Sequence, residues 1–432
     1  MALSTRTMPP SEVVESPQVG RWADRDLLIV CHNYDTFVKS QVDPLAAAFD
    51  SVTILVRYNP IAAVSDYLPI QWLQPYRKDA KLNLASVPEN VTVAVTPLWY
   101  LPTDRGYKRL GGKHARALRA QVDRLGIDPD LIHAHFTWTA GYAATRLGAD
   151  REVPVVLTVH ANRDRFLDEY TSGLPDVYET WRDADAIVRV NERDVPLLER
   201  YSENVRAIPN GFSRDRYRLL DRDEARSELG VDPDRKVIFT LGTLKRRKGH
   251  RFLVEAMERV VAEFPDALCV IGGQGATLRD LRRRVRRRGL EDHVEILGYV
   301  PEREVDVWMN ACDAFCLPSL SEGNPTVMFE ALGCGKPYIG TAVGGVSEVI
   351  TDEAYGLLCE PANPDALAAA LTEALGREWD AEGIRTYADA FTWERITDGI
   401  EGLYASLLDD EPGSAEATDG TNRDRIPAGR RP

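Results

Sequence analysis

Lysine and paired cysteines are both scarce in this chain. It holds 9 lysines against 44 arginines, and none of its 6 cysteines forms a CxxC pair. Several cysteines fall inside runs predicted to be strands or helices, so buried free thiols in a reducing compartment are expected rather than disulfides. The sequence also lacks an apolar run of bilayer length, and residues 1–10 lack the apolar core of a signal peptide. We expect a cytoplasmic protein that is at most peripheral to the inner face of a membrane.

Positive charge is in deficit. The 53 basic and 67 acidic residues give a net charge of −14, which argues against a general nucleic-acid-binding function. An acidic, lysine-poor composition resembles that of salt-adapted proteins, but it concerns solvation and not chemistry. The chain of 432 residues, 44% of them apolar, exceeds the size of a single core, so two domains are expected.

Short apolar runs of strand type alternate with helical patterns in two consecutive sets. The first set is Leu27–Cys31, Val52–Val56, Val91–Val95, Asp130–His133, Val155–Thr158 and Ala186–Val190; the second is Val237–Leu241, Leu268–Ile271, Val294–Leu297, Ala314–Leu317 and Tyr338–Gly340. Near-continuous apolar runs are typical of parallel strands covered on both faces. The pattern therefore predicts an α/β protein with two doubly wound domains and a cleft between them.

The turn and charged stretch that follow Ile208 suggest a domain boundary near residue 212. We predict a flexible arm (1–23), a first domain (24–211), a second domain (212–390), a C-terminal helix (391–408) and a disordered tail (409–432).

The strongest chemical signal is a pair of carboxylates, Glu322 and Glu330, separated by seven residues around a predicted helix start. Gly323 can take a tight turn and Pro325 suits the first helical position. A strand, loop and helix in this order direct backbone N–H groups at an anion, while the second carboxylate can accept hydrogen bonds from a diol. The alternative is a solvated helix. Glu330 lies inside the apolar string Val327–Leu332, however, which favours a binding site for a sugar nucleotide.

A basic loop, Thr240–Gly249, follows the first strand of the second set and precedes a helix predicted over His250–Phe264. Lys248 at the helix entrance can neutralise the charge that develops on a leaving diphosphate. A solvated loop is the alternative interpretation. The glycine-rich strand end Val270–Gly275 is interpreted as a wall of the same pocket, although such loops often serve close packing only.

Three of the 7 histidines lie at the ends of two strands of the first set, which suggests a polar pocket. His160, which leaves its strand toward Asn162, is the best candidate to face the cleft. At least one of His133 and His135 is expected to be structural. A zinc site is the competing interpretation, but no acidic or thiol ligands share a metal-like spacing with these histidines.

Two basic areas stand out in the sequence, and the default interpretation of the first, an arginine-rich helix, is a solvated face. In the arginine-rich run Thr277–Arg288, Leu278, Leu281 and Val285 keep one apolar stripe. Contact with anionic lipid or nucleic acid is the minority interpretation. An aromatic and basic area from Leu98 to Arg116 could meet an acceptor or a membrane surface.

With these residues in view, the chain resembles the retaining glycosyltransferases of family 4, which have the GT-B fold, over about residues 25–408. The motifs that carry the resemblance are Pro129–His135, Val155–His160, Ala184–Val188, Ile208–Gly211, Lys248–Gly249, Leu297–Gly298, Pro318–Ala331, Gly335–Pro337 and Gly344–Gly345. Such a fold implies two Rossmann-like domains that face each other across a cleft, with the C-terminal helix returning to the first domain.

The resemblance implies a role for each matching residue. Lys248 would hold the donor diphosphate, Glu322 the donor sugar and Glu330 the ribose, while His160 would face the reaction centre. The full donor side would comprise Gly242, Thr243, Lys248, Gly249, Gly273, Glu322, Gly323, Asn324, Pro325, Thr326 and Glu330, and the acceptor side Thr36, Phe37, His135 and Asn162. The family typically needs no metal and no cofactor beyond the nucleoside-diphosphate sugar.

The sequence departs from the family pattern in three places. Thr243 stands where family members often carry a second cation, a role that Arg246 or Arg247 could take. Ser213 replaces the usual Asp after the Asn-Gly turn. The double-glycine loop after the first strand is replaced by Asn33–Gln41, which looks like the Thr-Phe variant of some polysaccharide-building members.

We therefore expect a retaining glycosyltransferase of the hexosyltransferase type (EC 2.4), acting on a hydroxyl acceptor in polysaccharide, glycolipid or glycoprotein glycan assembly. Two alternatives stay open. A GT-B epimerase would turn over the sugar nucleotide without an acceptor. A non-catalytic sugar-nucleotide-binding protein would be favoured if the charged pocket residues were lost, but Lys248, Glu322 and Glu330 are all present.

Overall fold

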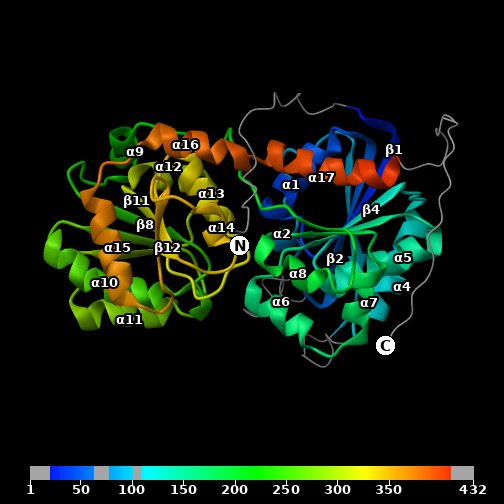
Figure 1. Ribbon diagram of the computed structural model, residues 1–432, viewed down its shortest axis with the longest axis horizontal. Coiled ribbons are helices and arrows are strands. Elements are labelled where there is room, and N and C mark those ends of the chain that lie inside the picture. The colour runs from blue at the N-terminus through cyan, green and yellow to red at the C-terminus, as the bar shows by residue number, and fades with distance from the viewer. Residues whose placement is uncertain (1–19, 63–76, 101–108, 410–432) are drawn as a thin grey trace, which may run out of the picture.

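The computed structural model describes residues 20–62, 77–100 and 109–409. Most of the predicted N-terminal arm, part of the aromatic and basic area, and the predicted tail after residue 409 lie outside these ranges. The described chain forms two lobes side by side, each built on a parallel sheet (Figure 1). Among the described residues, no helix combines the length and the apolar character that a bilayer crossing demands.

The first lobe contains a seven-stranded sheet in the order β3-β2-β1-β4-β5-β6-β7, with all neighbours parallel. Its strands are β1 (Trp22–Cys31), β2 (Phe49–Tyr58), β3 (Val91–Pro97), β4 (Leu131–His135), β5 (Val155–Val159), β6 (Ala186–Arg189) and β7 (Val205–Ala207). The strand order reverses direction between β1 and β4. Ligands of doubly wound sheets bind outside such a reversal.

The second lobe repeats this plan with six parallel strands in the order β10-β9-β8-β11-β12-β13. They are β8 (Val237–Leu241), β9 (Leu268–Gly272), β10 (Val294–Gly298), β11 (Ala314–Leu317), β12 (Tyr338–Thr341) and β13 (Gly356–Cys359). Here the reversal lies between β8 and β11. The predicted fold class, two doubly wound α/β units, is confirmed.

Helices cover both sheets on both faces. They are α1 (Thr36–Ala46), α2 (Lys78–Lys81), α4 (Gly111–Leu125), α5 (Tyr142–Arg151), α6 (Arg163–Tyr170), α7 (Pro175–Asp183), α8 (Val195–Leu198), α9 (Arg222–Leu229), α10 (His250–Glu263), α11 (Leu278–Arg288), α12 (Glu302–Ala311), α13 (Thr326–Gly333), α14 (Val346–Val349), α15 (Pro364–Gly376), α16 (Ala381–Ala388) and α17 (Trp393–Leu408). Short turns η3 (Thr137–Gly141), η4 (Glu192–Asp194), η5 (Arg246–Lys248) and η6 (Asp389–Phe391) complete the set.

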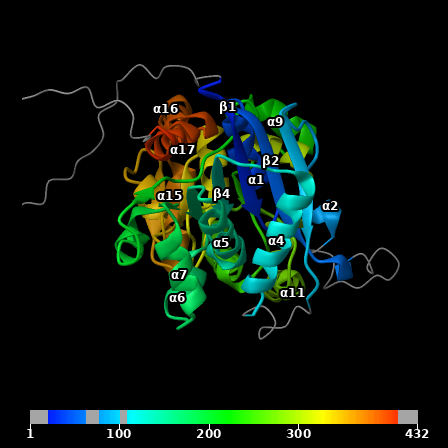
Figure 2. The same ribbon diagram turned by 90° about the vertical axis from the view of Figure 1, so that its right-hand side faces the viewer.

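The C-terminal helix α17 returns to the first lobe, as predicted. Apolar residues of α17 share a core with β1, β2 and α1, while α4, α5 and α7 cover the opposite face of the sheet (Figures 1 and 2). The Tyr404 hydroxyl lies 2.6 Å from His133 Nδ1, and His133 Nε2 lies 2.7 Å from the Thr158 hydroxyl. His133 is fully buried, so its role is structural.

Two local expectations need correction. The edge strands β7 and β13 were not predicted, because each has only three or four residues and lacks a long apolar run. Pro325 was expected at the first helical position, but it adopts extended backbone angles as the N-cap of α13, which begins at Thr326. The residue before a helix needs such angles, and proline supplies them without a donor N–H.

Candidate functional site

Two loops meet at the strand-order reversal of the second sheet. The loop after β8 spans Gly242–Gly249, and the loop after β11 spans Pro318–Pro325. Gly249 holds the two loops together: its φ is +69°, and a Cβ there would lie 1.7 Å from the Pro318 carbonyl oxygen. Only glycine permits this approach. The basic loop is thereby fixed beside the loop that carries Glu322.

Glu322 is the centre of a buried ion-pair cluster. Its Oε1 lies 2.7 Å from Lys248 Nζ, and its Oε2 lies 3.0 Å from Arg247 Nη1. The Ser319 hydroxyl donates a 2.5 Å hydrogen bond to the same carboxylate. Burial alone would raise the pKa of Glu322, which is 4% exposed, but Lys248 and Arg247 outweigh burial and lower it. The carboxylate is therefore ionised at neutral pH.

Arg247, and not Arg246, joins this cluster. Arg247 donates to Glu322 and, over 2.6 Å, to the Ser321 carbonyl, whereas Arg246 lines a different pocket on the far side of the loop. Thr243 is exposed. The side chain of Lys248 passes close to Gly242, where a Cβ would lie 3.8 Å from Lys248 Cε. The site therefore has two cations, Lys248 and Arg247, although Thr243 stands where family members often carry the second one.

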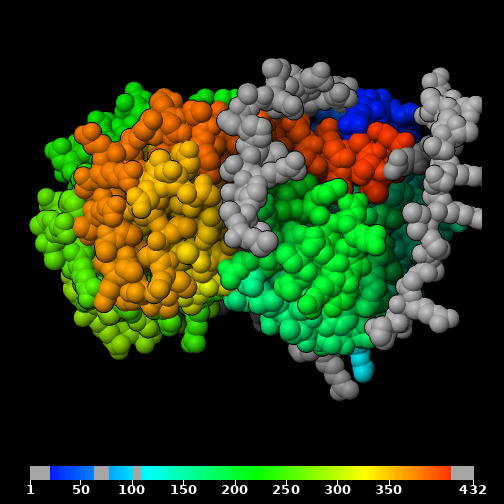
Figure 3. All heavy atoms as spheres, in the orientation of Figure 1, coloured from blue at the N-terminus to red at the C-terminus, as the bar shows by residue number. Residues whose placement is uncertain are grey.

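The loop after β11 also meets the first domain. A Cβ on Gly323 would lie 3.1 Å from the Ala161 carbonyl oxygen, and the Arg163 N–H lies 3.4 Å from the Glu322 carbonyl. The Asn210 backbone N–H donates to Asn324 Oδ1 over 2.9 Å. Figure 3 shows the second domain against the first along a seam. The carboxylate cluster therefore lies where the two domains touch.

His160 approaches the site from the first domain. Its Nε2 lies 2.9 Å from His135 Nδ1, and its ring packs edge-on against Phe37 with centroids 4.9 Å apart. Burial, followed by His135 and Arg189, holds the pKa of His160 well below its usual range, so the ring is neutral. His135 is fully buried and contacts the site through His160. Asn162, predicted on the acceptor side, caps α6 by accepting from the Arg165 N–H over 3.2 Å.

An interdomain pocket of about 410 Å³ is lined by residues of both domains, and none of them belongs to the ion-pair cluster at Glu322. Thr36 and Phe37 contribute from α1, and Thr326 and Glu330 from α13. Burial raises the pKa of Glu330 to about 7, against the lowering effect of Arg216 and of a hydrogen bond with Tyr217. The predicted ribose-binding carboxylate thus shares a pocket with two residues predicted on the acceptor side.

The remaining predicted residues lie at the same edge of the second sheet. Gly273 has a φ of +135°, and a Cβ there would lie 1.8 Å from the Gly242 carbonyl oxygen, so its role is close packing of two loops. No group of three or more His, Cys, Asp or Glu side chains in the described ranges is arranged to hold a metal ion.

Several residues of the site were not predicted. Arg216 pairs with Glu302 over 2.9 Å, and Glu302 also receives a hydrogen bond from Thr36 across the cleft. Glu348 accepts hydrogen bonds of 2.8 and 3.0 Å from the backbone N–H groups of Glu192 and Arg193 in the first domain. Glu302 begins α12 and Glu348 lies in the short helix α14, whereas Arg216 lies in the charged stretch before α9. The Asn-Gly turn after Ile208, used above to place the domain boundary, was the one sequence feature that pointed to this part of the cleft.

Comparison with known proteins identifies the family. The family model of glycosyl transferases group 1 matches residues 221–390, and that of glycosyltransferase family 4 matches residues 75–216. A D-inositol 3-phosphate glycosyltransferase of Geodermatophilus obscurus is 30% identical over 322 residues, which cover 68% of this chain and 70% of that protein. The Bacillus subtilis glycosyltransferase TuaC, whose name refers to teichuronic acid biosynthesis, is 32% identical over 60% of this chain and 64% of its own length.

Solved structures agree on the fold. A sucrose-phosphate synthase from Thermosynechococcus elongatus superposes with a TM-score of 0.71 at 22% identity, covering 89% of this chain and 99% of that chain. Anabaena HepE in complex with UDP gives 0.67 at 20% identity, covering 88% and 99%. The predicted family and fold are confirmed: the chain belongs to the family 4, group 1 glycosyltransferases and has the GT-B fold.

Proposed function

We propose that this protein transfers a sugar from a nucleoside-diphosphate sugar to a hydroxyl acceptor with retention of the anomeric configuration. One observation carries the proposal: Lys248 and Arg247 converge on Glu322 within 3.0 Å, at the strand-order reversal of the second sheet and against the first domain. Two adjacent cations match the charge of a diphosphate, and the carboxylate beside them can accept hydrogen bonds from sugar hydroxyls.

The donor would extend from this cluster into the interdomain pocket. Glu330 there provides a carboxylate for the two ribose hydroxyls, and the pocket volume of about 410 Å³ suits a nucleoside. Anabaena HepE, a protein of the same fold, was solved in complex with UDP, which supports a nucleotide as part of the ligand. The base and the sugar are left open.

Transfer then needs the leaving diphosphate to be stabilised while the acceptor hydroxyl attacks. Lys248 and Arg247 would neutralise the charge that develops on the departing phosphate. In a front-face mechanism, a phosphate oxygen takes the proton of the acceptor. On the pocket wall from α1 the residues are Thr36, Phe37 and Ser40, and the two carboxylates of the lining, Glu302 and Glu330, both come from the second domain.

His160 would hold the sugar from the first domain. Nε2 of its neutral ring is engaged by His135, whose ring lies 5.1 Å away and fixes its orientation, so Nδ1 is the atom left for the sugar. Contacts between the domains, such as that of Gly323 with Ala161, would exclude the water that otherwise hydrolyses the donor. The name of one relative refers to D-inositol 3-phosphate and that of the other to teichuronic acid biosynthesis, so the acceptor is proposed only as a hydroxyl compound.

The test begins with a thermal-shift screen of UDP-, GDP-, ADP- and dTDP-sugars, because a donor at 100 times its Kd stabilises by about 2.7 kcal/mol. Turnover of the best donor is then compared in the wild type and in Lys248→Ala. We expect kcat to fall by about 10²–10³-fold, since loss of one charge-stabilising donor has that effect. Arg279→Ala, an exposed cation on α11, is the charge-matched control.

Near-normal turnover by Lys248→Ala would refute the assignment. The same assay without acceptor separates transfer from epimerisation, because an epimerase changes the donor sugar when no acceptor is present. The anomeric configuration of the product, read by the proton coupling constant in NMR, tests retention.

A further inference from the structure

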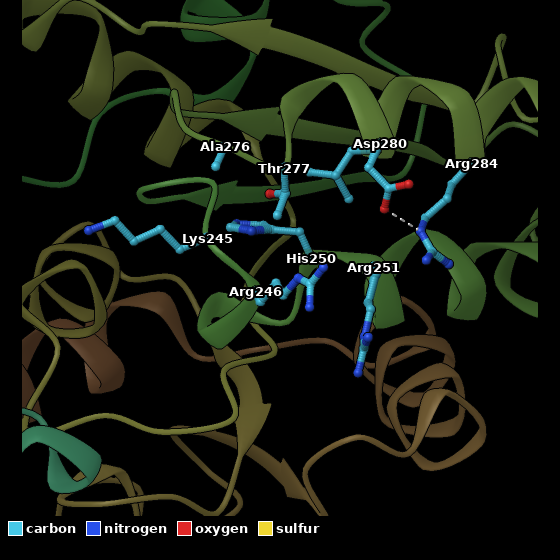
Figure 4. A pocket seen from close by; sticks show the side chains of 9 residues that line it. Lys245, Arg246, His250, Arg251, Ala276, Thr277, Asp280 and Arg284 are labelled. Carbon is cyan, nitrogen blue, oxygen red and sulfur yellow. Dashed lines mark hydrogen bonds and ion pairs between the residues drawn. The ribbon is translucent and has the colours of Figure 1, made fainter. Parts of the chain in front are cut away.

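A second pocket, of about 600 Å³, lies in the second domain between the loop after β8 and the loop after β9. We call it the loop pocket and define it by Lys245, Arg246, His250, Arg251, Thr277 and Arg284. In Figure 4, Lys245 lies at one end, Arg251 and Arg284 lie toward the other, and His250 and Thr277 lie between them. It shares no lining residue with the interdomain pocket. The proposed donor chemistry therefore does not account for it.

His250 is the feature that points to a ligand. The residue is only 2% exposed, yet neither ring nitrogen has a hydrogen-bond partner within the described chain. Buried polar atoms are normally paired, because leaving them unpaired costs free energy. Burial, with the nearby charge of Lys248, lowers the pKa of His250 to about 4. The ring is therefore neutral and offers one donor and one acceptor to whatever lies in the pocket.

The charges around His250 favour an anion. Within the described residues, Lys245, Arg246 and Arg251 form no ion pair closer than 4.0 Å, although Arg246 helps Arg284 to lower the pKa of Asp280, which also lines the pocket. Arg284 is different, since it is neutralised by Asp280 at 2.8 Å and Glu255 at 3.0 Å. The lining therefore carries four cations against one carboxylate, that of Asp280, in a chain of net charge −14. Like charges are brought together in this way when a ligand of opposite sign binds among them.

Helix α10 adds a further attraction for an anion. Its first two residues, His250 and Arg251, line the pocket, and its N-cap is Gly249, which has no side chain to accept from the first N–H groups. The N-terminus of this 14-residue helix carries partial positive charge. The Thr277 hydroxyl stands on the opposite wall.

We propose that the loop pocket binds a phosphate-class dianion that is distinct from the diphosphate of the donor. Donors from several directions suit the oxygens of a tetrahedral phosphate better than the two oxygens of a carboxylate. The volume exceeds that of one phosphate group, so the phosphate belongs to a larger molecule, either a soluble phosphorylated compound or the headgroup of a lipid.

The test measures binding of inorganic phosphate to the full chain by isothermal titration calorimetry. We expect one saturable site, weakened about tenfold or more in Lys245→Ala/Arg246→Ala, because charge-assisted hydrogen bonds are lost. The matched control is Arg279→Ala/Arg282→Ala, which removes the same charge from the exposed face of α11 outside the pocket. The control should change the affinity less than twofold, roughly what loss of diffuse surface charge does. His250→Phe should weaken phosphate binding while the melting temperature stays high.

Three results would overturn the proposal: no saturable phosphate binding by the wild type, equal weakening in both double variants, or loss of binding in Lys248→Ala with retention in Lys245→Ala/Arg246→Ala. The last result would assign the phosphate to the donor site. The source of the phosphate is found by flotation with vesicles. Binding to phosphatidylglycerol vesicles but not to phosphatidylcholine vesicles, lost only in Lys245→Ala/Arg246→Ala, identifies a lipid headgroup. Phosphate binding without flotation identifies a soluble compound.

Discussion

The second domain presents charged groups at the cleft, whereas the first domain presents neutral ones. Lys248, Arg247 and Glu322 form a network within 3.0 Å on one side, while the other side offers the neutral ring of His160 and the Phe37 ring packed against it. Both sheets have the same parallel plan and the same type of strand-order reversal. One topology thus supports two kinds of surface, which depend on the loops after the strands.

This difference suggests a division of labour. Charges held in place before binding can stabilise a leaving diphosphate without reorganisation, so the second domain would supply most of the stabilisation of the transition state. Neutral groups give little electrostatic stabilisation but can fix a sugar and exclude water. Substitutions on the two sides should therefore affect different kinetic parameters.

The largest effect is expected for Glu322→Gln in the second domain. The amide keeps the shape of the side chain but removes the charge that orients Lys248 and Arg247 at 2.7 and 3.0 Å. We expect kcat to fall by about 10²–10³-fold. Affinity for the nucleoside diphosphate should be unchanged or higher, because its phosphates can replace the lost carboxylate. Calorimetric titration of the nucleoside diphosphate beside initial-rate kinetics checks both points, and a parallel loss of binding and turnover would contradict this division.

In the first domain, His160→Gln should lower kcat by about 10²-fold, since a misplaced reactant loses that much, while KM for the donor changes little. The donor would be held almost wholly by the second domain, so His160→Gln should leave donor binding unchanged. His293→Gln is the matched control, because His293 lies on the second domain away from the cleft and bonds only the Ala267 carbonyl in the described chain. A large rise in donor KM for His160→Gln would show that the first domain also holds the donor.

The charged side of the cleft, in the second domain, could be predicted from the sequence more fully than the neutral side, in the first domain. Lys248 and Glu322 lie in loops that directly follow strands with strong apolar runs, and Glu330 lies in the helix α13 that begins where the second loop ends, so their common edge could be inferred. Arg247 remained one of two candidates, because the turn η5 decides which arginine faces Glu322. On the neutral side, the burial of His135 beneath His160 depends on the pairing of the strands β4 and β5, and the burial of His133 depends on Tyr404 of α17; neither contact is visible in local sequence.

A smaller effect is expected from Glu330 in the second domain, and this effect should depend on pH. Its pKa of about 7 means that the carboxyl is protonated below that pH and ionised above it. The ionised form is the better acceptor for ribose hydroxyls, so donor KM should fall as the pH rises from 6 to 8. Glu330→Gln should flatten this dependence and raise KM by about tenfold at pH 8. A 2′-deoxy donor should show the same loss with the wild type and no further loss with the variant.

Glu330 also makes stability depend on pH, with the opposite sign: a higher pH should favour donor binding but lower the stability of the fold. Because the folded state holds a proton on Glu330 between the ordinary pKa of 4.5 and about 7, the unfolded chain binds fewer protons in that range. The contribution of Glu330 to the free energy of unfolding therefore falls as the pH rises through this window. Thermal melts of the wild type and Glu330→Gln between pH 5 and 8 should converge at the acidic end.

The smallest effect is expected where the two sides are joined. Glu348 of the second domain accepts from the Glu192 and Arg193 N–H groups of the first, much as a capping side chain does. Glu348→Ala removes these bonds without touching either proposed surface, so it should shift the domains toward a more open arrangement and raise acceptor KM by about fivefold, the equivalent of one lost cap. Small-angle scattering should show a larger radius of gyration than for Glu353→Ala, an exposed control on the same domain. If kcat fell as steeply as in Glu322→Gln while the radius stayed constant, Glu348 would have to act on the chemistry itself, and the charged side would extend further than the three residues at Glu322.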